Sequence, residues 1–339
     1  MDVNSKQAVD FITRCFRANL TCMLSGSPGI GKSSIIASIA ENYGMELIDI
    51  RLSTYDPIDI AGIPMIKGDV CSFIPMDTFP LEGRDTPPNG KSGWIILLDE
   101  LNSASLAVQA AAYQLVLDRQ VGQHKLHSKA LIVCAGNLAT DGAIVNRMGT
   151  AMQSRLIHLN LKIGIKEWLV WAANNDIDHR VMAYVNNVPT NLHNFDPKHD
   201  DVTFSCPRTW SFLSRLIKDI PTEGLRELTP LLAGTVSTSV ATEFISYTSV
   251  YSQIPDYKAI LSNPAGEVVK KEPAMLFAMS HMIASHLEKK DLDKIMIYIE
   301  RMPPEFQTTT LQGVMQRDSS LIKEKVIMDW IAKYGAILL

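Results

Sequence analysis

The sequence predicts an α/β fold in which a parallel β-sheet with covering helices occupies residues 1–162 and an all-helical region follows. Two observations predict it. Between residues 20 and 160, five short apolar runs alternate with segments whose apolar residues recur at helical spacing, which is typical of βαβ units in a parallel sheet. From about residue 165 onward only helical patterns occur, and this change predicts a domain boundary near residue 162.

Each predicted strand is a short apolar run bounded by polar or turn-forming residues. The five runs cover residues 20–24, 45–52, 94–98, 129–135 and 156–160. Helices are expected before and between them, at residues 5–18, 32–41, 105–117 and 142–154. After the boundary, helical patterns cover residues 165–175, 178–187, 207–219, 225–251, 273–289, 291–301 and 319–334. The segment 53–93 contains several prolines and glycines, and we interpret it as a surface insertion or mobile loop with a short hairpin around residues 65–74.

Composition indicates a globular protein with a sizeable core and no strong charge. Of the 339 residues 46% are hydrophobic and 20% are charged, and the net charge is −4. This charge disfavours a nucleic-acid partner, which attracts clustered positive charge. The five cysteines form no C-x-x-C pair, which indicates buried thiols in a reducing compartment. The start of the chain lacks the apolar core of a signal peptide and no stretch approaches a membrane span, so we expect a cytoplasmic protein.

The most informative stretch is residues 26–33, Gly-Ser-Pro-Gly-Ile-Gly-Lys-Ser, which fits the G-x-x-x-x-G-K-[ST] pattern at every fixed position. A predicted strand precedes it and a predicted helix follows it, as the motif requires. Backbone N–H groups of such a loop point inward at a phosphate, and the helix N-terminus adds partial positive charge. The expected cradle comprises Gly26, Ser27, Pro28, Gly29, Ile30, Gly31, Lys32, Ser33 and Ser34. Lys32 is expected to reach the β- and γ-phosphates and the Ser33 hydroxyl to bind Mg²⁺, so the sequence predicts a nucleoside triphosphate site.

Polar residues follow two later strands. Asp99 and Glu100 end the apolar run at 94–98, and Asn137 follows the run at 129–135. Ligands bind at the carboxyl ends of strands in open α/β sheets, so we expect these side chains to face the phosphate loop. Asp99 is then expected to order the Mg²⁺ shell and Glu100 to orient or deprotonate the attacking water. Asn137 could hold that water or the γ-phosphate.

The order of these motifs resembles the AAA+ ATPases, and within them the MoxR-like branch. The likeness is carried by four parts of the chain. Residues 51–64 resemble the segment after the second strand, and residues 98–104 with 108–110 and then 118–122 resemble the Walker B strand and the next helix. Residues 135–137 resemble sensor 1, and residues 206–210 resemble the start of the lid helix. It implies an AAA+ core with a five-stranded parallel sheet (1–162), an α-helical lid (163–255) and a helical C-terminal extension (256–339).

The resemblance also implies roles for single residues. Asn137 would be sensor 1, and Arg208 would be sensor 2 acting within its own chain. Arg155 stands where the family places the arginine finger that acts on the neighbouring subunit, and Arg147 is a second candidate. The family pattern Asp-Arg-Phe is absent there, since residues 153–156 read Gln-Ser-Arg-Leu. Adenine is the base that the resemblance implies, and the guanine signature Asn-Lys-x-Asp is absent.

The function expected from this likeness is ATP hydrolysis with Mg²⁺ in a homo-oligomeric ring, usually a hexamer, that remodels or activates a protein client. In this branch a von Willebrand factor A-type partner commonly adapts the motor to its target. Two alternatives stay open. One is a nucleic-acid translocase of the restriction type, which the acidic composition disfavours. The other is a nucleotide-gated assembly protein with slow turnover.

Overall fold

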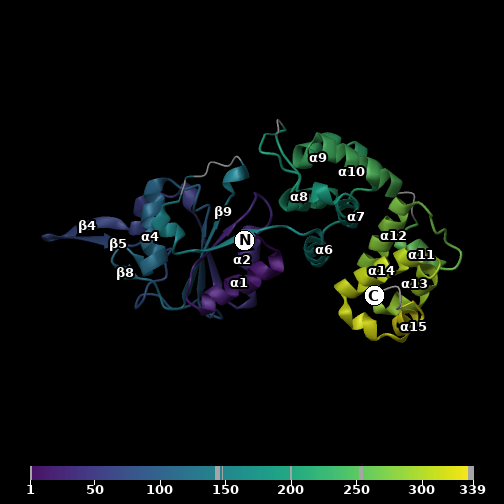
Figure 1. The fold of residues 1–339 in the computed structure, drawn as a ribbon, viewed down its shortest axis with the longest axis horizontal. Coiled ribbons are helices and arrows are strands. Elements are labelled where there is room, and N and C mark those ends of the chain that lie inside the picture. The colour runs from purple at the N-terminus through teal and green to yellow at the C-terminus, as the bar shows by residue number, and fades with distance from the viewer. Residues whose placement is uncertain (1, 142–145, 147, 199–200, 252–254, 335–339) are drawn as a thin grey trace. The chain divides into compact units, whose positions relative to one another are not determined.

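The computed structural model describes residues 2–141, 146, 148–198, 201–251 and 255–334 (Figure 1). The chain divides into two units. The first comprises residues 1–164 and the short segment 196–199, and the second comprises residues 165–195 and 200–339. The first unit contains the strands of the main sheet, and the second is helical. The finer division into core, lid and extension remains a prediction.

The first unit is built on a six-stranded parallel sheet. From one edge to the other its strands are β1 (Asp2–Val3), β10 (Ile157–Leu161), β2 (Cys22–Ser25), β9 (Ala130–Gly136), β6 (Trp94–Asp99) and β3 (Glu46–Arg51). With the helical region that follows, this confirms the α/β class that the sequence predicts, a parallel sheet with covering helices followed by an all-helical region. The expected count of five strands is wrong by one, because Asp2 and Val3 pair with Asn160 and Leu161 of β10. Two residues are too few to form a recognisable strand pattern.

Helices cover both faces of this sheet (Figure 1). On one face lie α1 (Ser5–Arg17) and α2 (Lys32–Asn42), and on the other lies α4 (Leu106–Asp118). Successive residues of β6 alternate between the two cores: Leu97 packs on the side of α1 and α2, and Ile96 and Leu98 pack on the side of α4. Burial on both faces explains why these strands read as continuous apolar runs.

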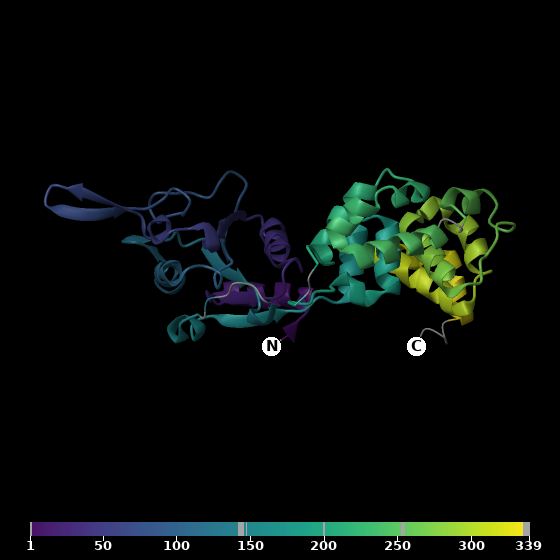
Figure 2. The same ribbon diagram turned by 90° about the horizontal axis from the view of Figure 1, so that it is seen from above.

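The predicted hairpin within the insertion is confirmed. After the short helix α3 (Pro57–Ala61), strands β4 (Ile63–Lys67) and β5 (Val70–Ile74) pair antiparallel. Figure 2 shows this hairpin extending away from the main sheet. A smaller hairpin, β7 (Gln120–Val121) and β8 (His124–Lys125), follows α4.

The helix expected at residues 142–154 is largely wrong within the described residues. Only α5 (Thr150–Gln153) is helical, and Gly149 begins it as the N-cap residue. Asn146 is not helical because its main-chain N–H donates to the oxygen of Asn102 at 2.7 Å and its side chain donates to the oxygen of Ala104 at 2.8 Å. Residues 142–145 and 147 lie outside the described residues.

The second unit consists of helices joined by turns and by two longer connections, at residues 188–206 and 263–272. They are α6 (Ile165–Asn174), α7 (His179–Asn187), α8 (Pro207–Ile217), α9 (Thr229–Val236), α10 (Thr238–Tyr251), α11 (Tyr257–Ser262), α12 (Pro273–His286), α13 (Leu292–Ile299), α14 (Pro304–Arg317) and α15 (Lys325–Tyr334). Short 3₁₀ turns are η1 (Leu52–Thr54) and η2 (Ala139–Asp141) in the first unit, and η3 (Pro189–Leu192), η4 (Thr222–Arg226), η5 (Lys289–Asp291) and η6 (Ser319–Lys323) in the second. None of the described helices combines the length and the apolar character needed to cross a bilayer.

Two helical expectations need correction. The pattern at 225–251 predicts one helix, but Ser237 at φ 89° separates α9 from α10. Helix α14 lies outside the helical patterns found in the sequence, because its residues are rich in Thr and Gln and lack a clear apolar stripe. It is nevertheless packed closely: Gly313 faces Ala284 of α12, where an added Cβ would lie 3.0 Å from the alanine methyl carbon.

Candidate nucleotide-binding site

The phosphate loop connects β2 to α2 and is shaped by its glycines. Gly29 and Gly31 have φ of 75° and 96°, a region that glycine adopts without steric cost. Gly31 is the N-cap of α2, so the N–H groups of the first helical turn, which have no acceptor within the helix, lie at the end of the loop. At Gly26 an added Cβ would lie 2.6 Å from Ile30 Cδ1. The loop therefore depends on glycine at both its beginning and its end, as an anion-binding turn does.

Lys32 links this loop to the end of a neighbouring strand. Its ammonium donates to the main-chain oxygens of Gly26 at 2.7 Å and Ser27 at 3.0 Å, and to Asn137 Oδ1 at 3.0 Å. The residue is 8% exposed. The structure thus brings together Lys32 and Asn137, which lie 105 positions apart in the sequence.

Ser33 and Asp99 form the second contact of the site. Ser33 Oγ donates to Asp99 Oδ2 at 2.8 Å. Magnesium binds hard oxygen ligands at 2.0–2.1 Å in an octahedron, so two neighbouring ligands lie about 2.9 Å apart. A hydroxyl and a carboxylate oxygen at this separation fit Mg²⁺ in both donor type and spacing. In the part of the chain that the structure describes, no three His, Cys, Asp or Glu side chains group into a metal site, so a magnesium ion here would take further ligands from water and phosphate.

Glu100 follows Asp99 where the chain leaves β6. Its backbone is left-handed, with φ 57°, and its N–H donates to Asp99 Oδ1 at 2.8 Å. Its carboxylate accepts a hydrogen bond from the Ser53 hydroxyl. Ser53 lies in the turn η1 after β3, and sequence reasoning did not identify it as a site residue. A serine after a strand is common, so only its approach to Glu100 distinguishes it.

The carboxyl ends of β3 and β6 concentrate negative charge. Partial burial raises the pKa of Asp49, and the nearby carboxylates of Asp99 and Glu100 raise it further, whereas Arg51 opposes the shift. A magnesium ion would be attracted to this end of the sheet, because a cation relieves such repulsion.

The three predicted arginines are placed differently. Arg155 is exposed in the first unit, where it donates to the oxygen of Ala151 at 3.0 Å and its guanidinium lies 5.6 Å from the ring centre of Tyr113. Among the described residues it makes no hydrogen bond to the phosphate loop. Arg208 is exposed in the first turn of α8, in the second unit. Arg147 lies outside the described residues. The roles of all three remain predictions.

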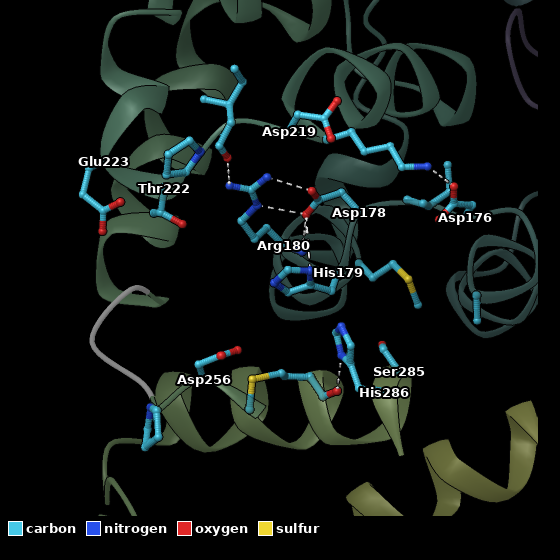
Figure 3. A pocket seen from close by; sticks show the side chains of 18 of the residues that line it. Asp176, Asp178, His179, Arg180, Asp219, Thr222, Glu223, Asp256, Ser285 and His286 are labelled. Carbon is cyan, nitrogen blue, oxygen red and sulfur yellow. Dashed lines mark hydrogen bonds and ion pairs between the residues drawn. The ribbon is translucent and has the colours of Figure 1, made fainter. Parts of the chain in front are cut away.

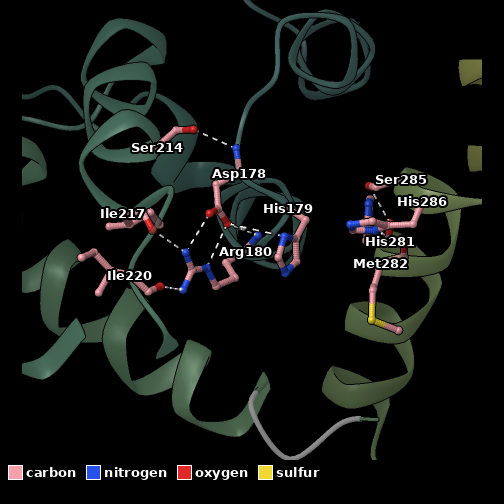
Figure 4. Close-up of polar contacts among 10 residues, drawn as sticks. All are labelled: Asp178, His179, Arg180, Ser214, Ile217, Ile220, His281, Met282, Ser285 and His286. Carbon is pink, nitrogen blue, oxygen red and sulfur yellow. Dashed lines mark hydrogen bonds and ion pairs between the residues drawn. The ribbon is translucent and has the colours of Figure 1, made fainter. Parts of the chain in front are cut away.

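The second unit contains a separate cavity of about 800 Å³ with charged walls, lined by residues of α7, of α12 and of the segment 218–223 that follows α8 (Figure 3). Arg180 donates to both oxygens of Asp178, at 3.0 and 2.7 Å, in an ion pair whose side chains are each 6% exposed. The same guanidinium donates to the main-chain oxygens of Ile217 and Ile220 (Figure 4). This buried charge therefore fastens the end of α8 to the start of α7 and is explained by helix packing.

Comparison with protein-family models gives no match. Among solved structures, similarity is found to a candidate ATPase from Cytophaga hutchinsonii, with 13% identity, TM-score 0.37, and coverage of 98% of this chain and 88% of that chain. Similarity is also found to NtrX from Brucella abortus, in complexes with ADP and with ATP, with 12% identity, TM-score 0.38, and coverage of 98% of this chain and 68% of that chain. These values are too low to transfer an activity to this chain.

Proposed function

We propose that this chain is an ATP hydrolase of the AAA+ type, within the MoxR-like branch, that remodels or activates a protein client. The observation that carries the proposal is a convergence of side chains at the carboxyl ends of the parallel strands. Lys32 and Ser33 come from the start of α2, Asp99 and Glu100 from the end of β6, and Asn137 from the end of β9. Together they supply a phosphate cradle, a cation, a metal-ligand pair, a carboxylate and an amide.

Binding of the triphosphate is the task of the loop. The N–H groups at the start of α2 are donors to phosphate oxygens, and the ammonium of Lys32 exchanges its bonds to Gly26 and Ser27 for the β- and γ-phosphates. Ser33 and Asp99 would hold Mg²⁺, which when bound neutralises charge on the phosphates.

Hydrolysis requires a water molecule in line with the γ-phosphate. Glu100 is the group suited to orient this water and accept its proton. Its carboxylate lies next to Asp99 but is not part of the Ser33–Asp99 pair that would hold Mg²⁺. Asn137 lies beside Lys32, where its amide can contact the γ-phosphate or the water.

The partners follow from the resemblance. In a homo-oligomeric ring, most commonly a hexamer, Arg155 or Arg147 would reach the nucleotide of the neighbouring subunit, and Arg208 would act from the lid of the same chain. The exposure of Arg155 and Arg208 supports these roles, since an arginine buried in an internal ion pair could not reach a nucleotide. A von Willebrand factor A-type adaptor and a protein client complete the proposal.

ATP turnover of point variants tests the central claim. Lys32→Ala should abolish nucleotide binding and turnover. Glu100→Gln should bind ATP and lower kcat by about 10²-fold or more, because the general base is lost. Lys91→Ala and Glu46→Gln are matched controls, since these side chains form an ion pair at the amino end of β3, away from the loop. Equal turnover in the wild type, Lys32→Ala and Glu100→Gln would refute the proposal.

One observation favours a second candidate, a nucleotide-gated assembly protein with slow turnover. Lys32 and Glu100 are both engaged by internal partners in this structure. For such a protein, ATP would drive ring formation while wild-type turnover stays as low as that of Glu100→Gln. Sedimentation of the wild type and of Glu100→Gln, each with and without ATP, together with their turnover rates, separates the two functions.

A further inference from the structure

Asn102 forms a pair of hydrogen bonds with the backbone of Asn137. Its Nδ2 donates to the main-chain oxygen of Asn137 at 2.7 Å, and its Oδ1 accepts the main-chain N–H of Asn137 at 3.2 Å. One planar amide therefore satisfies both backbone polar groups of a single residue. Asn102 is 9% exposed and Asn137 is half-buried, so these groups have limited access to water. Leaving them without a partner would cost stability, which makes this contact hard to break.

Gly136 is required for this contact. A Cβ added to Gly136 would lie 2.2 Å from Asn102 Oδ1 and 2.5 Å from Met23 Cε. Gly136 is not among the glycines with positive φ, so its backbone conformation does not call for glycine. The absence of a side chain therefore serves the approach of Asn102, which explains the glycine of the 135–137 segment in physical terms.

Asn102 is itself held at a fixed position. Its main-chain oxygen accepts the N–H of Asn146 at 2.7 Å, and the N–H of the preceding residue, Leu101, donates to the oxygen of Ala135 at 3.1 Å. The turn that contains Asn102 is thus tied to β9 through Leu101 and to Asn146 through the main-chain oxygen of Asn102. Movement of Asn137 relative to this turn would break several hydrogen bonds at once.

The contact between Asn102 and Asn137 joins two groups assigned to catalysis, Glu100 and the side chain of Asn137. Asn102 is two residues beyond Glu100, and the side chain of Asn137 meets the Lys32 ammonium at 3.0 Å. We infer that Asn102 is a positioning residue: it fixes the Asn137 amide at a set place relative to Glu100 and Lys32. This inference rests on the proposed function. Displacing a reacting group by about 1 Å can cost about 10²-fold in rate, so the contact matters beyond its contribution to stability.

The test is a double-mutant cycle on ATP turnover in the 339-residue chain. Asn102→Ala should lower kcat by about 10- to 100-fold with KM for ATP changed little, because binding depends on the loop and not on this contact. Combined with Asn137→Ala, it should cause no further loss, since Asn102 acts through Asn137. Gly136→Ala should reproduce the loss of kcat from the other side of the contact, and it serves as the second variant if Asn102→Ala does not fold.

Asn146→Ala is the matched control. It removes one side-chain hydrogen bond, to the oxygen of Ala104, in the same region but keeps the main-chain N–H that Asn102 accepts. It should lower the unfolding temperature, though less than Asn102→Ala, while kcat stays within about twofold of the wild type.

The outcomes separate this inference from the proposed function. Wild-type turnover no higher than that of Glu100→Gln would overturn the proposed function, and this inference with it. Normal wild-type turnover with an unchanged kcat in Asn102→Ala, or losses that add to those of Asn137→Ala, would overturn the inference alone. So would an equal loss of kcat in Asn146→Ala, because the effect would then follow stability and not the position of Asn137.

Discussion

At the residue scale, Lys32, Glu100 and Asn137 each have an internal partner: a loop carbonyl, the Ser53 hydroxyl and the Asn102 amide respectively. The first two partners compete with substrate or water for the same side chain, because a donor to Glu100 occupies the oxygen that would accept a proton. The third holds main-chain atoms and leaves the Asn137 side chain available to Lys32. Loss of Ser53 and loss of Asn102 are therefore expected to act in opposite directions.

Ser53→Ala should raise the ATP turnover of the isolated protein. The hydroxyl holds the Glu100 carboxylate, and a hydrogen bond at this exposed position is worth about 1 kcal/mol, so its loss should raise kcat by about fivefold. Steady-state turnover at saturating ATP measures this. Thr54→Ala is the matched control, because its hydroxyl donates to the oxygen of Arg51 and not to Glu100. A fall in turnover in Ser53→Ala would mean that the Ser53 hydroxyl assists Glu100 in orienting or deprotonating the attacking water.

One class of candidate site residue could be named from the sequence, and the roles of its members remain predictions. Lys32, Ser33, Asp99 and Glu100 stand at fixed spacing in motifs whose strand and helix context can be recognised. Asn102 and Ser53 could not be predicted, because each is a common turn residue whose partner lies far away in the sequence: 35 positions to Asn137 and 47 to Glu100. Their significance depends on how the ends of β3, β6 and β9 meet.

At the element scale, prediction succeeded where burial on two faces made a strand continuously apolar, as in β6 and β9. Prediction failed where strand pairing or helix packing determined the structure although the local sequence pattern was weak. Strand β1 exists because β10 offers a free edge, and α14 is stabilised by packing on α12 despite its Thr-rich sequence. Asn146 lies in a segment of helical composition, but its own hydrogen bonds to the oxygens of Asn102 and Ala104 hold this residue in a non-helical conformation.

The junction of α7 and α8 allows an element-scale prediction. Arg180→Met should lower the unfolding free energy of the second unit by about 3–5 kcal/mol, because it leaves Asp178 buried without its charge partner and frees the oxygens of Ile217 and Ile220 (Figure 4). Urea unfolding followed by tryptophan fluorescence measures this. Lys218→Met is the control, since its ion pair with Asp176 is exposed, and it should change little. Asp178→Asn with Arg180→Met should recover part of the loss, because no unpaired charge remains buried.

At the scale of the whole molecule, the change of sequence pattern near residue 162 lies close to the division of the structure at residues 164 and 165. Local patterns sufficed here, because an alternating α/β region and an all-helical region bury their apolar residues in separate cores. Ring assembly lies beyond such patterns, since it depends on surfaces whose complementarity only a second chain can test.

The proposed ring makes a prediction that a lone chain cannot satisfy. If Arg155 acts on the neighbouring subunit, Arg155→Ala and Glu100→Gln should each have low turnover, since a trans arginine is worth about 10³–10⁵ in rate. In a mixed ring, an interface is intact when a subunit with Glu100 faces a neighbour with Arg155. Random assembly from equal amounts makes about one interface in four intact, so the mixture should regain about a quarter of wild-type turnover.

The alternatives give different results in the same measurement. An arginine that acts within its own chain leaves every subunit of the mixture defective, so mixing would restore nothing. Normal turnover in Arg155→Ala alone would move the role to Arg147 or remove the need for a neighbouring chain. Because both variants keep Lys32, nucleotide binding serves as the internal control for folding, and a recovered rate can come only from contact between different chains.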